Sequence, residues 1–251
     1  MKKVLILSLM INLFFIIAFG YLINRRGGIN YLKTKIGISS TSQKNHNKPG
    51  WYYTNYKYWK EKKTLFEILP KKTGQIVFVG NSITDGCEWS ELFDNPNIIN
   101  RGIGGDNTEG LLERLNDITI SKPKKVFLEI GINDLGIQLS TNEIISNYGK
   151  IIDQIEKESP NCQLFIQSVL PTRNHHIIKN DSVIVLNQKL KDLSAKRKIN
   201  YINLYDSFTD SDGNLSEKYS IDGIHLLGQG YLQWKDLINN YLYDKEIGKS
   251  N

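Results

Sequence analysis

Ser82 lies where a predicted strand turns into a predicted helix, in the segment GNSITDG. A short apolar run, residues 75–80, ends just before it and predicts a buried β-strand. At such a turn a serine hydroxyl stands above the sheet, and the backbone N–H groups of the next turn can face an oxyanion. Ser82 is therefore a candidate nucleophile. A serine here can equally cap the following helix, and the segment alone does not separate the two interpretations.

His225 and Asp222 are candidates for the partners that a serine nucleophile needs. An imidazole must accept the proton of the hydroxyl, and a carboxylate must hold the imidazole in the right tautomer. Asp222 precedes His225 by three residues in SIDGIHLLGQGY, just before a predicted last helix, so one loop can carry both side chains. A turn followed by a surface histidine would have the same composition, so this segment alone is not decisive.

Two further strand ends offer groups that can stabilise a negative charge. A second predicted strand runs into NRGIGGDNT, whose glycines let backbone N–H groups approach a reacting atom closely. Asn107 breaks the G-x-G-x-x-G spacing of a dinucleotide site, so we expect no cofactor there. A third strand ends in GINDLG, where the Asn133 amide can add a donor, although this composition is also common in turns.

The remaining histidines and the cysteines do not indicate a metal site. His46 lies in a polar segment near the N-terminus, and His175 and His176 lie in a polar loop after the fourth predicted strand. Neither these residues nor the acidic residues cluster with the spacing of metal ligands. Cys87 and Cys162 form no C-x-x-C pair and are too few for a disulfide framework, so we expect two free thiols.

The elements that would position these residues alternate between short apolar runs and longer amphipathic segments. This alternation predicts an α/β domain with a parallel sheet covered by helices on both faces, because parallel strands need long crossovers. In such sheets, ligands bind beyond the carboxyl ends of the strands, where all the segments above fall. We predict strands at residues 75–80, 97–100, 125–131, 163–169 and 200–204, and helices at 109–118, 142–158, 183–198 and 229–243.

The charge of the chain is uneven along its length. Its formal net charge is +6, but residues 1–50 carry eight basic residues and no acidic one. The other 24 basic residues face all 26 acidic residues within 51–251, so that part is close to neutral. A nucleic-acid-binding domain needs a basic surface that attracts phosphates, so the charge pattern argues against nucleic acid as a partner.

Residues 4–23 are almost entirely apolar, and twenty helical residues span a hydrocarbon layer of about 30 Å. We predict that residues 1–26 form an uncleaved membrane anchor rather than a signal peptide or a buried core helix. The apolar run exceeds a signal peptide core, and the exit at 18–20 is a poor cleavage site. The positive-inside rule slightly favours a cytoplasmic domain, but the short Lys-Lys start is typical of export and favours an extracytoplasmic one.

A chain of 251 residues suits one ordinary domain plus an appendage, and therefore one active site. Residues 27–50 are polar and lack apolar periodicity, which predicts a flexible tether. We expect the domain to cover residues 51–251. It begins with the aromatic run WYYTNYKYW, in which near-helical spacing favours core packing, although a carbohydrate-stacking surface or an interfacial belt would look alike.

The segments that end the first three strands and open the last helix together resemble the SGNH hydrolase (GDSL-like lipase/acylhydrolase) family. Its four short blocks all appear in order, as GNSIT, NRGIGGD, GIND and DGIH, across about residues 75–245. Each block is weakly specific, but the ordered set is strongly specific. Within the family, the chain is most similar to bacterial acetylesterases of the platelet-activating-factor acetylhydrolase type.

The resemblance implies a three-layer α/β/α fold of flavodoxin-like architecture, with five parallel strands in the order 2-1-3-4-5. It also implies Ser82 as the nucleophile, with His225 and Asp222 as its triad partners. One position departs from the pattern, because Asn81 stands where the GDSL signature has Asp. Since this residue only flanks the nucleophile, the change should leave the triad intact.

The resemblance further implies an oxyanion hole made by the backbone N–H groups of Ser82 and Gly105 and by the side chain of Asn133. Gly105 is chosen because it immediately precedes Asp106 and so matches the G-D pair of that block. Asp106 and Arg173 are expected, in addition, to contact the substrate.

Together these residues predict a serine ester hydrolase that removes a short acyl group, often acetyl, from a carbohydrate through an acyl-enzyme, with no cofactor and no metal. A lysophospholipid, another lipid ester or a thioester is the alternative substrate. An O-acetyltransferase with the same triad would pass the acyl group to an alcohol instead of water. The non-enzymatic alternative is a membrane-tethered binding module, against which an intact triad argues. The sequence does not indicate the oligomeric state.

Overall fold

The structure is a computed structural model that describes residues 12, 21 and 50–243, without the side chains of 50–56. The predicted anchor at 1–26 and tether at 27–50 lie outside this part of the chain, apart from residues 12, 21 and 50, so both stay predictions. Within the described residues, no helix combines the length and the apolar character that a membrane span requires. The chain divides into two compact units, Met1–Lys48 and Pro49–Asn251, and the elements below belong to the second.

Five parallel strands form one sheet in the order β2-β1-β3-β4-β5, which confirms the predicted topology. At the end of β1, Gly80 lies opposite Gly102 of β2 on one side and Glu129 of β3 on the other. Because the strands are parallel, their carboxyl ends lie at one edge, and the segments that follow them meet there. The strands are β1 (Ile76–Gly80), β2 (Ile98–Gly102), β3 (Lys125–Glu129), β4 (Gln163–Gln167) and β5 (Asn200–Ile202).

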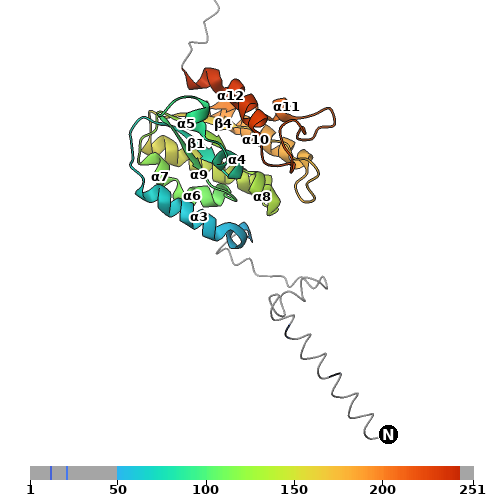
Figure 1. Cartoon of the computed structure of the whole chain (residues 1–251). Helices are drawn as coiled ribbons and strands as arrows, with labels where there is room; N and C mark the ends of the chain where they lie inside the picture. The colour runs from blue at the N-terminus through green and yellow to red at the C-terminus, as the bar shows by residue number, and fades with distance from the viewer. Residues whose placement is uncertain (1–11, 13–20, 22–49, 244–251) are drawn as a thin grey trace, which may run out of the picture. The chain divides into compact units, whose positions relative to one another are not determined.

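Helices cover both faces of the sheet, as Figure 1 shows, and each face has its own apolar core. Alternate side chains of a strand point to opposite faces, so Val77 and Val79 of β1 enter one core while Phe78 enters the other. The first core includes residues of α6 (Thr108–Arg114), α7 (Asn116–Thr119), α9 (Thr141–Glu158) and α10 (Asn180–Arg197). The second includes residues of α4 (Ser82–Asp85), α5 (Trp89–Leu92), α11 (Tyr205–Phe208) and α12 (Gly228–Leu242). The three-layer α/β/α fold is therefore present.

The predicted strands are all present, although three of them end two residues earlier than expected. Strands β3, β4 and β5 stop where the chain turns toward the edge of the sheet, and Gly131, soon after β3, has a positive φ of 132° that an extended strand does not contain. The predicted helix at 109–118 is two short helices, α6 and α7, instead of one. Both cysteines are free thiols, as expected.

The helix predicted after Ser82 is present as the short helix α4. Four other helices of the described residues were not predicted, and three of them are only one turn or slightly longer: α5, α11 and α8 (Ile132–Gly136). The fourth, α3 (Gly50–Ile68), contains the aromatic run. Trp59 and Phe66 of α3 are buried and form a third small core with Ile103. The packing interpretation of the aromatic run is therefore correct for Trp59, whereas Tyr58 of the same run is exposed. Figure 1 shows α3 and α12 at opposite ends of the domain in that view.

Two glycines allow α4 to pack directly on the ends of the central strands. A Cβ atom on Gly80 would lie 2.2 Å from both the Glu129 carbonyl oxygen and the Thr84 hydroxyl, and one on Gly102 would lie 2.3 Å from the Asp85 nitrogen. No residue with a side chain fits at either position without a shift of the backbone. This close contact places Ser82, the first residue of α4, at the edge of the sheet.

Candidate active site

Asn81 and Ser82 form the turn between β1 and α4. Asn81 is the N-cap of α4, and its side-chain oxygen accepts a hydrogen bond of 2.8 Å from the Ile83 nitrogen. An aspartate would present the same oxygen to the same N–H group. The departure from the family signature at this position therefore preserves the cap that orients Ser82.

Ser82, His225 and Asp222 form a continuous chain of hydrogen bonds, as the sequence predicts. The Ser82 Oγ atom is 2.9 Å from Nε2 of His225, and the Nδ1 atom of the same ring is 2.7 Å from Oδ2 of Asp222. Both distances are those of hydrogen bonds. The imidazole can thus accept the serine proton at one nitrogen while the carboxylate holds the other nitrogen in its protonated tautomer.

Asp222 is held in its charged form by the loop that carries it. Partial burial raises the pKa of this carboxyl, but hydrogen bonds from the His225 ring and from the backbone nitrogens of Ile224 and His225 outweigh it, so the pKa lies well below its usual range. Those two backbone bonds are 2.9 Å and 2.8 Å long and both end on Oδ1, which leaves Oδ2 for the ring. The carboxylate therefore orients the imidazole and stays ionised at neutral pH.

Arg173 supports the loop that carries Asp222. Its guanidinium donates to the carbonyl oxygens of Leu215, Ser220 and Ile221, and its backbone nitrogen donates to the Gly223 carbonyl at 2.9 Å. The side chain is only 12% exposed. These bonds position the segment that bears Asp222, and the predicted contact of Arg173 with the substrate stays a prediction.

The backbone of the second block presents one glycine N–H group in preference to the other. The Gly104 nitrogen donates to Oδ2 of Asp85 at 3.1 Å, so its hydrogen is already used. Gly105 follows with a positive φ of 78°, a conformation that favours glycine. The hydrogen bond of Gly104 thus leaves Gly105 as the predicted oxyanion donor on this loop.

Asn133, the predicted third donor, is tied to the same loop. Its Nδ2 atom donates to the Asp106 carbonyl oxygen at 2.8 Å. A side-chain amide has two N–H bonds, so this contact fixes the plane of the amide and leaves the second hydrogen for an oxyanion. Since β1 pairs with both β2 and β3, the segments bearing Ser82, Gly105 and Asn133 follow neighbouring strands at one edge of the sheet.

The side chain of Asp106 does not bind substrate as predicted, because it is fully buried. One carboxylate oxygen accepts from Trp59 Nε1 at 2.9 Å and from the Asn107 nitrogen at 3.0 Å. The other accepts from Nε of Arg114 at 2.8 Å. Residues 103–107, between β2 and α6, carry the predicted oxyanion donor Gly105 and are called the oxyanion loop below. Asp106 is a structural residue of this loop, and it contributes to the site through its backbone carbonyl.

Arg114 and Trp59 were missed in the sequence. Arg114 is buried at the end of α6, where it also donates to the Arg101 and Gly80 carbonyl oxygens and so joins β1, β2 and the Asp106 turn. An arginine on the apolar side of a predicted helix was the available signal, because such a residue needs a buried acid as its partner. Trp59 gave no signal beyond its place in the aromatic run.

Glu129 is a buried acid beside the nucleophile loop. It ends β3 opposite Gly80, it is fully buried, and among the described residues neither carboxyl oxygen has a hydrogen-bond partner. Burial raises the pKa of this carboxyl to about 8. At neutral pH the side chain is therefore largely protonated, and it adds little charge to the site.

In the described part of the chain, no three His, Cys, Asp or Glu residues come together in a way that would hold a metal ion. His175 accepts two backbone hydrogen bonds at Nδ1, from Ile177 at 3.2 Å and from Ile178 at 2.8 Å, so it shapes its own loop. His46 lies outside the described residues.

Comparisons with known proteins identify the family of this chain. The family model described as GDSL-like Lipase/Acylhydrolase family matches residues 78–232. Platelet-activating factor acetylhydrolase IB subunit alpha1 of Homo sapiens is 26% identical over 167 residues, which cover 64% of this chain and 71% of that protein. The alpha2 subunit of Rattus norvegicus is 28% identical over 167 residues and is covered to 72%.

Solved structures share the fold. A putative platelet activating factor from Streptococcus pneumonia superposes with a TM-score of 0.68 at 29% identity, over 77% of this chain and 95% of that one. An acetyl-xylooligosaccharide esterase from Geobacillus Stearmophilus superposes with a TM-score of 0.58, over 72% of this chain and 99% of that one. Its identity is 14%, so this likeness concerns the fold alone.

Proposed function

The chain belongs to the GDSL-like lipase/acylhydrolase family and is a carboxylic ester hydrolase, and from this premise we propose that it removes an acetyl group from an O-acetylated carbohydrate through an acyl-enzyme on Ser82. The observation that carries the proposal is the continuous line of hydrogen bonds from Ser82 through His225 to Asp222. A catalytically idle binding module would not need this alignment.

In the proposed reaction, Ser82 Oγ attacks the ester carbonyl carbon while His225 Nε2 takes the hydroxyl proton. The carbonyl oxygen becomes an oxyanion that accepts hydrogen bonds from the Ser82 and Gly105 nitrogens and from Asn133 Nδ2. Collapse breaks the bond to the leaving alkoxy group, which receives the proton from His225. Water then attacks the acyl-enzyme with the same base, releasing the carboxylic acid and restoring Ser82.

Two features support a short acyl group and a hydrophilic alcohol. Relatives of this chain are named platelet-activating factor acetylhydrolases, and an acetyl group is a two-carbon acyl group. In addition, the side chains of His225 and Asp222 are each 53% exposed, so the leaving-group side of the triad faces water. A sugar can stay hydrated there, whereas a long acyl chain would need an apolar channel to leave water.

The proposal is tested by measuring kcat/KM of the full-length protein on chromogenic esters with acyl chains of two, four, eight and twelve carbons. We expect the acetyl ester to be the best substrate, with activity falling as the chain lengthens. Acetate release from an acetylated xylo-oligosaccharide is then compared with release of fatty acid from a lysophospholipid. An organophosphonate ester should label the protein once, at Ser82, and Ser82→Ala is the matched control.

Faster turnover of the long-chain esters, together with fatty acid release, would show that the substrate is a lipid ester and not a carbohydrate ester. Transfer of acetyl to an added sugar in preference to water would make the protein an acetyltransferase. Labelling that persists in Ser82→Ala would remove Ser82 from the reaction.

We also propose that residues 1–26 anchor the enzyme in a membrane with its catalytic domain on the extracytoplasmic side, where O-acetylated cell-surface carbohydrates are accessible. The apolar run at 4–23 supports the anchor. Membrane fractions should contain the protein at its uncleaved mass, and protease added to intact cells should digest the domain. A soluble protein whose N-terminus begins near residue 20 would contradict the anchor, and protection from protease would contradict the orientation.

A further inference from the structure

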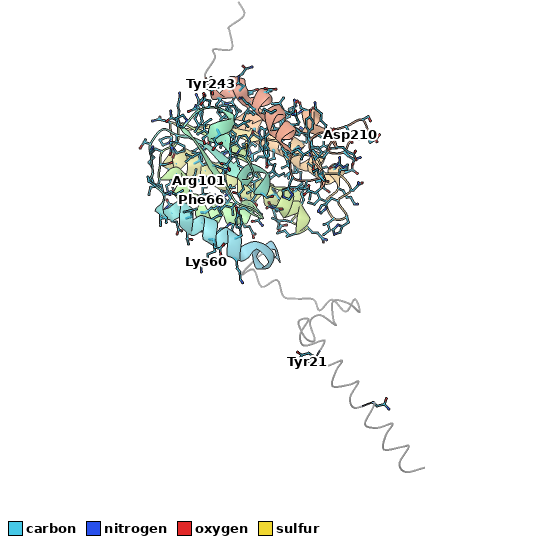
Figure 2. The ribbon with its side chains drawn as sticks, viewed as in Figure 1. Tyr21, Lys60, Phe66, Arg101, Asp210 and Tyr243 are labelled. Carbon is cyan, nitrogen blue, oxygen red and sulfur yellow. The ribbon has the colours of Figure 1, made fainter. Side chains whose placement is uncertain are left out.

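Helix α3 contacts the two segments that form the nucleophile side of the site. Trp59, which is 3% exposed, donates its indole N–H to Oδ1 of Asp106 at 2.9 Å. Two turns further along α3, Phe66 packs against Arg101 of β2, whose guanidinium carbon lies 4.7 Å from the ring centroid (Figure 2). The helix is therefore fixed to the strand that leads into the oxyanion loop and to the loop itself.

The same helix reaches α4, which begins with the nucleophile. The Tyr58 hydroxyl donates to Oδ2 of Asp85 at 2.6 Å, and Lys62 forms an ion pair with Oδ1 at 2.9 Å. Asp85 Oδ2 in turn accepts the Gly104 N–H. Neighbouring residues of α3 thus hold the oxyanion loop from both sides of Gly105, through Gly104 and through Asp106.

The Asp106 turn determines where two of the proposed oxyanion donors point. Its carbonyl oxygen accepts the bond that sets the plane of the Asn133 amide, and Gly105 is the residue before it. Oxyanion donors act at hydrogen-bond distances of about 2.7 to 3.1 Å, so a small rotation of this turn displaces both of them from the oxyanion.

We propose that Trp59 is a positioning residue for the oxyanion hole: its hydrogen bond to the Asp106 carboxylate fixes the turn that aims the Gly105 and Asn133 donors. The proposal rests on the proposed function, because it assigns these two donors to the oxyanion of the ester reaction. In this proposal Trp59 influences the oxyanion donors through Asp106.

The first test removes the hydrogen-bond donor of Trp59. Trp59→Phe in the full-length protein keeps an aromatic ring, smaller than the indole, in the α3 core and removes the indole N–H. We expect kcat on the acetyl ester to fall about tenfold with KM changed less than about twofold, because the donors matter mainly in the transition state. Titration with the organophosphonate counts the folded active sites, so that kcat is expressed per competent site.

Trp234→Phe is the matched control. Trp234 is also fully buried, and its indole N–H donates to Gln167 Oε1 at 2.7 Å, away from the oxyanion loop. This variant loses the same chemical group and an equally buried hydrogen bond. We expect its kcat per site to stay within about twofold of the wild type, since none of the three donors is displaced.

A double-mutant cycle with Asn133→Ala separates positioning from general stability. If Trp59 acts through the donors, the tenfold loss should shrink to about twofold once Asn133 is absent. An undiminished loss in the Asn133→Ala background, or wild-type kcat in Trp59→Phe, would overturn the inference while the proposed function stands. A wild-type protein that hydrolyses no ester would instead overturn the proposed function.

Discussion

The two halves of the active site are built in opposite ways. On the oxyanion side, Asp106, Asn107 and Arg114 are buried to at least 98%, and their hydrogen bonds join two strands and three helices. On the base side, Asp222 and His225 are about half exposed and lie on a loop without regular structure. Their position depends on Arg173 and on backbone bonds within the loop.

This difference matches what each half must do. Oxyanion donors lower the barrier only if they already point at the developing charge, so rigid burial favours them. The base must exchange protons with a leaving alcohol and with water, which requires access to solvent. We therefore expect changes on the oxyanion side to lower kcat sharply, whereas changes that support the base loop should have graded effects.

The largest effect is expected where the two halves meet. Ser82→Ala, His225→Ala and the double variant should each lose activity by about 10⁴- to 10⁶-fold, and their losses should not add, because nucleophile and base act as one unit. Asp222→Ala should be milder, since it leaves both of these groups in place. Burst and steady-state kinetics on the acetyl ester measure these losses. Additive losses would mean that Ser82 and His225 do not act together.

Asn133→Ala tests the buried half. We expect kcat to fall about 10² to 10³-fold with little change in KM, because the amide acts mainly on the transition state. Asn95→Ala, on the loop before β2, is a control for loss of an asparagine side chain that accepts only a local backbone bond. A tenfold increase in KM at constant kcat would make Asn133 a substrate-binding residue instead.

Arg173→Met tests the support of the exposed half. The variant keeps the apolar stem and removes the donors to three loop carbonyl groups, so we expect a loss of roughly 2 kcal/mol in the free energy of unfolding and about a tenfold loss in kcat. Arg173→Lys should recover only part of either quantity, because one ammonium cannot reach all three oxygens. Urea unfolding and kinetics give both values. Wild-type kcat in the Met variant would show that the loop holds Asp222 without Arg173.

The smallest effect on activity, with a clear effect on stability, is expected at Glu129. Its pKa of about 8 in the folded state lies above the ordinary 4.5, so the folded protein retains a proton that the unfolded chain releases between these values. Stability should therefore fall as the pH rises from about 4.5 through 8. Glu129→Gln removes this pH-dependent loss. The variant should have a free energy of unfolding higher by about 3 kcal/mol at pH 7, and by less toward pH 5.

Urea unfolding at pH 5, 7 and 8 measures this gain. Glu91→Gln, an exposed carboxyl on α5, is the control and should change stability by less than about 0.5 kcal/mol at each pH. A gain in Glu129→Gln that does not depend on pH would show that the carboxyl is not the group that titrates.

The sequence was sufficient for the sheet and for the triad because both depend on local patterns. Short apolar runs set the strands, and the ordered blocks identify Ser82, Asp222 and His225 without any knowledge of distance. The roles of Asp106 and Arg173 could not be predicted in this way. A charged residue near a motif looks the same in the sequence whether it faces the substrate or a buried partner. Only the fold shows that Trp59 and Arg114 donate hydrogen bonds to the Asp106 carboxylate.

Three short helices, α5, α8 and α11, were missed for a related reason, whereas the helix after Ser82 was predicted. Helices of four or five residues bury too few side chains to produce a period that can be recognised, and they form because tertiary packing fixes their ends. In α4 that packing is the contact with Gly80 and Gly102. Helix α3 is long enough to have a period, but neighbouring aromatic residues, the exposed Tyr58 and the buried Trp59, obscure its apolar side.

The separation of 143 residues between Ser82 and His225 determines when a newly made chain becomes active. All strand pairs are parallel, so none can form as a local hairpin and each must wait for a crossover segment. During synthesis the nucleophile and the oxyanion loop leave the ribosome before the base and α12. A partly synthesised chain can therefore complete its nucleophile side yet hydrolyse nothing, and recovery of esterase activity after dilution from urea reports the final step of folding.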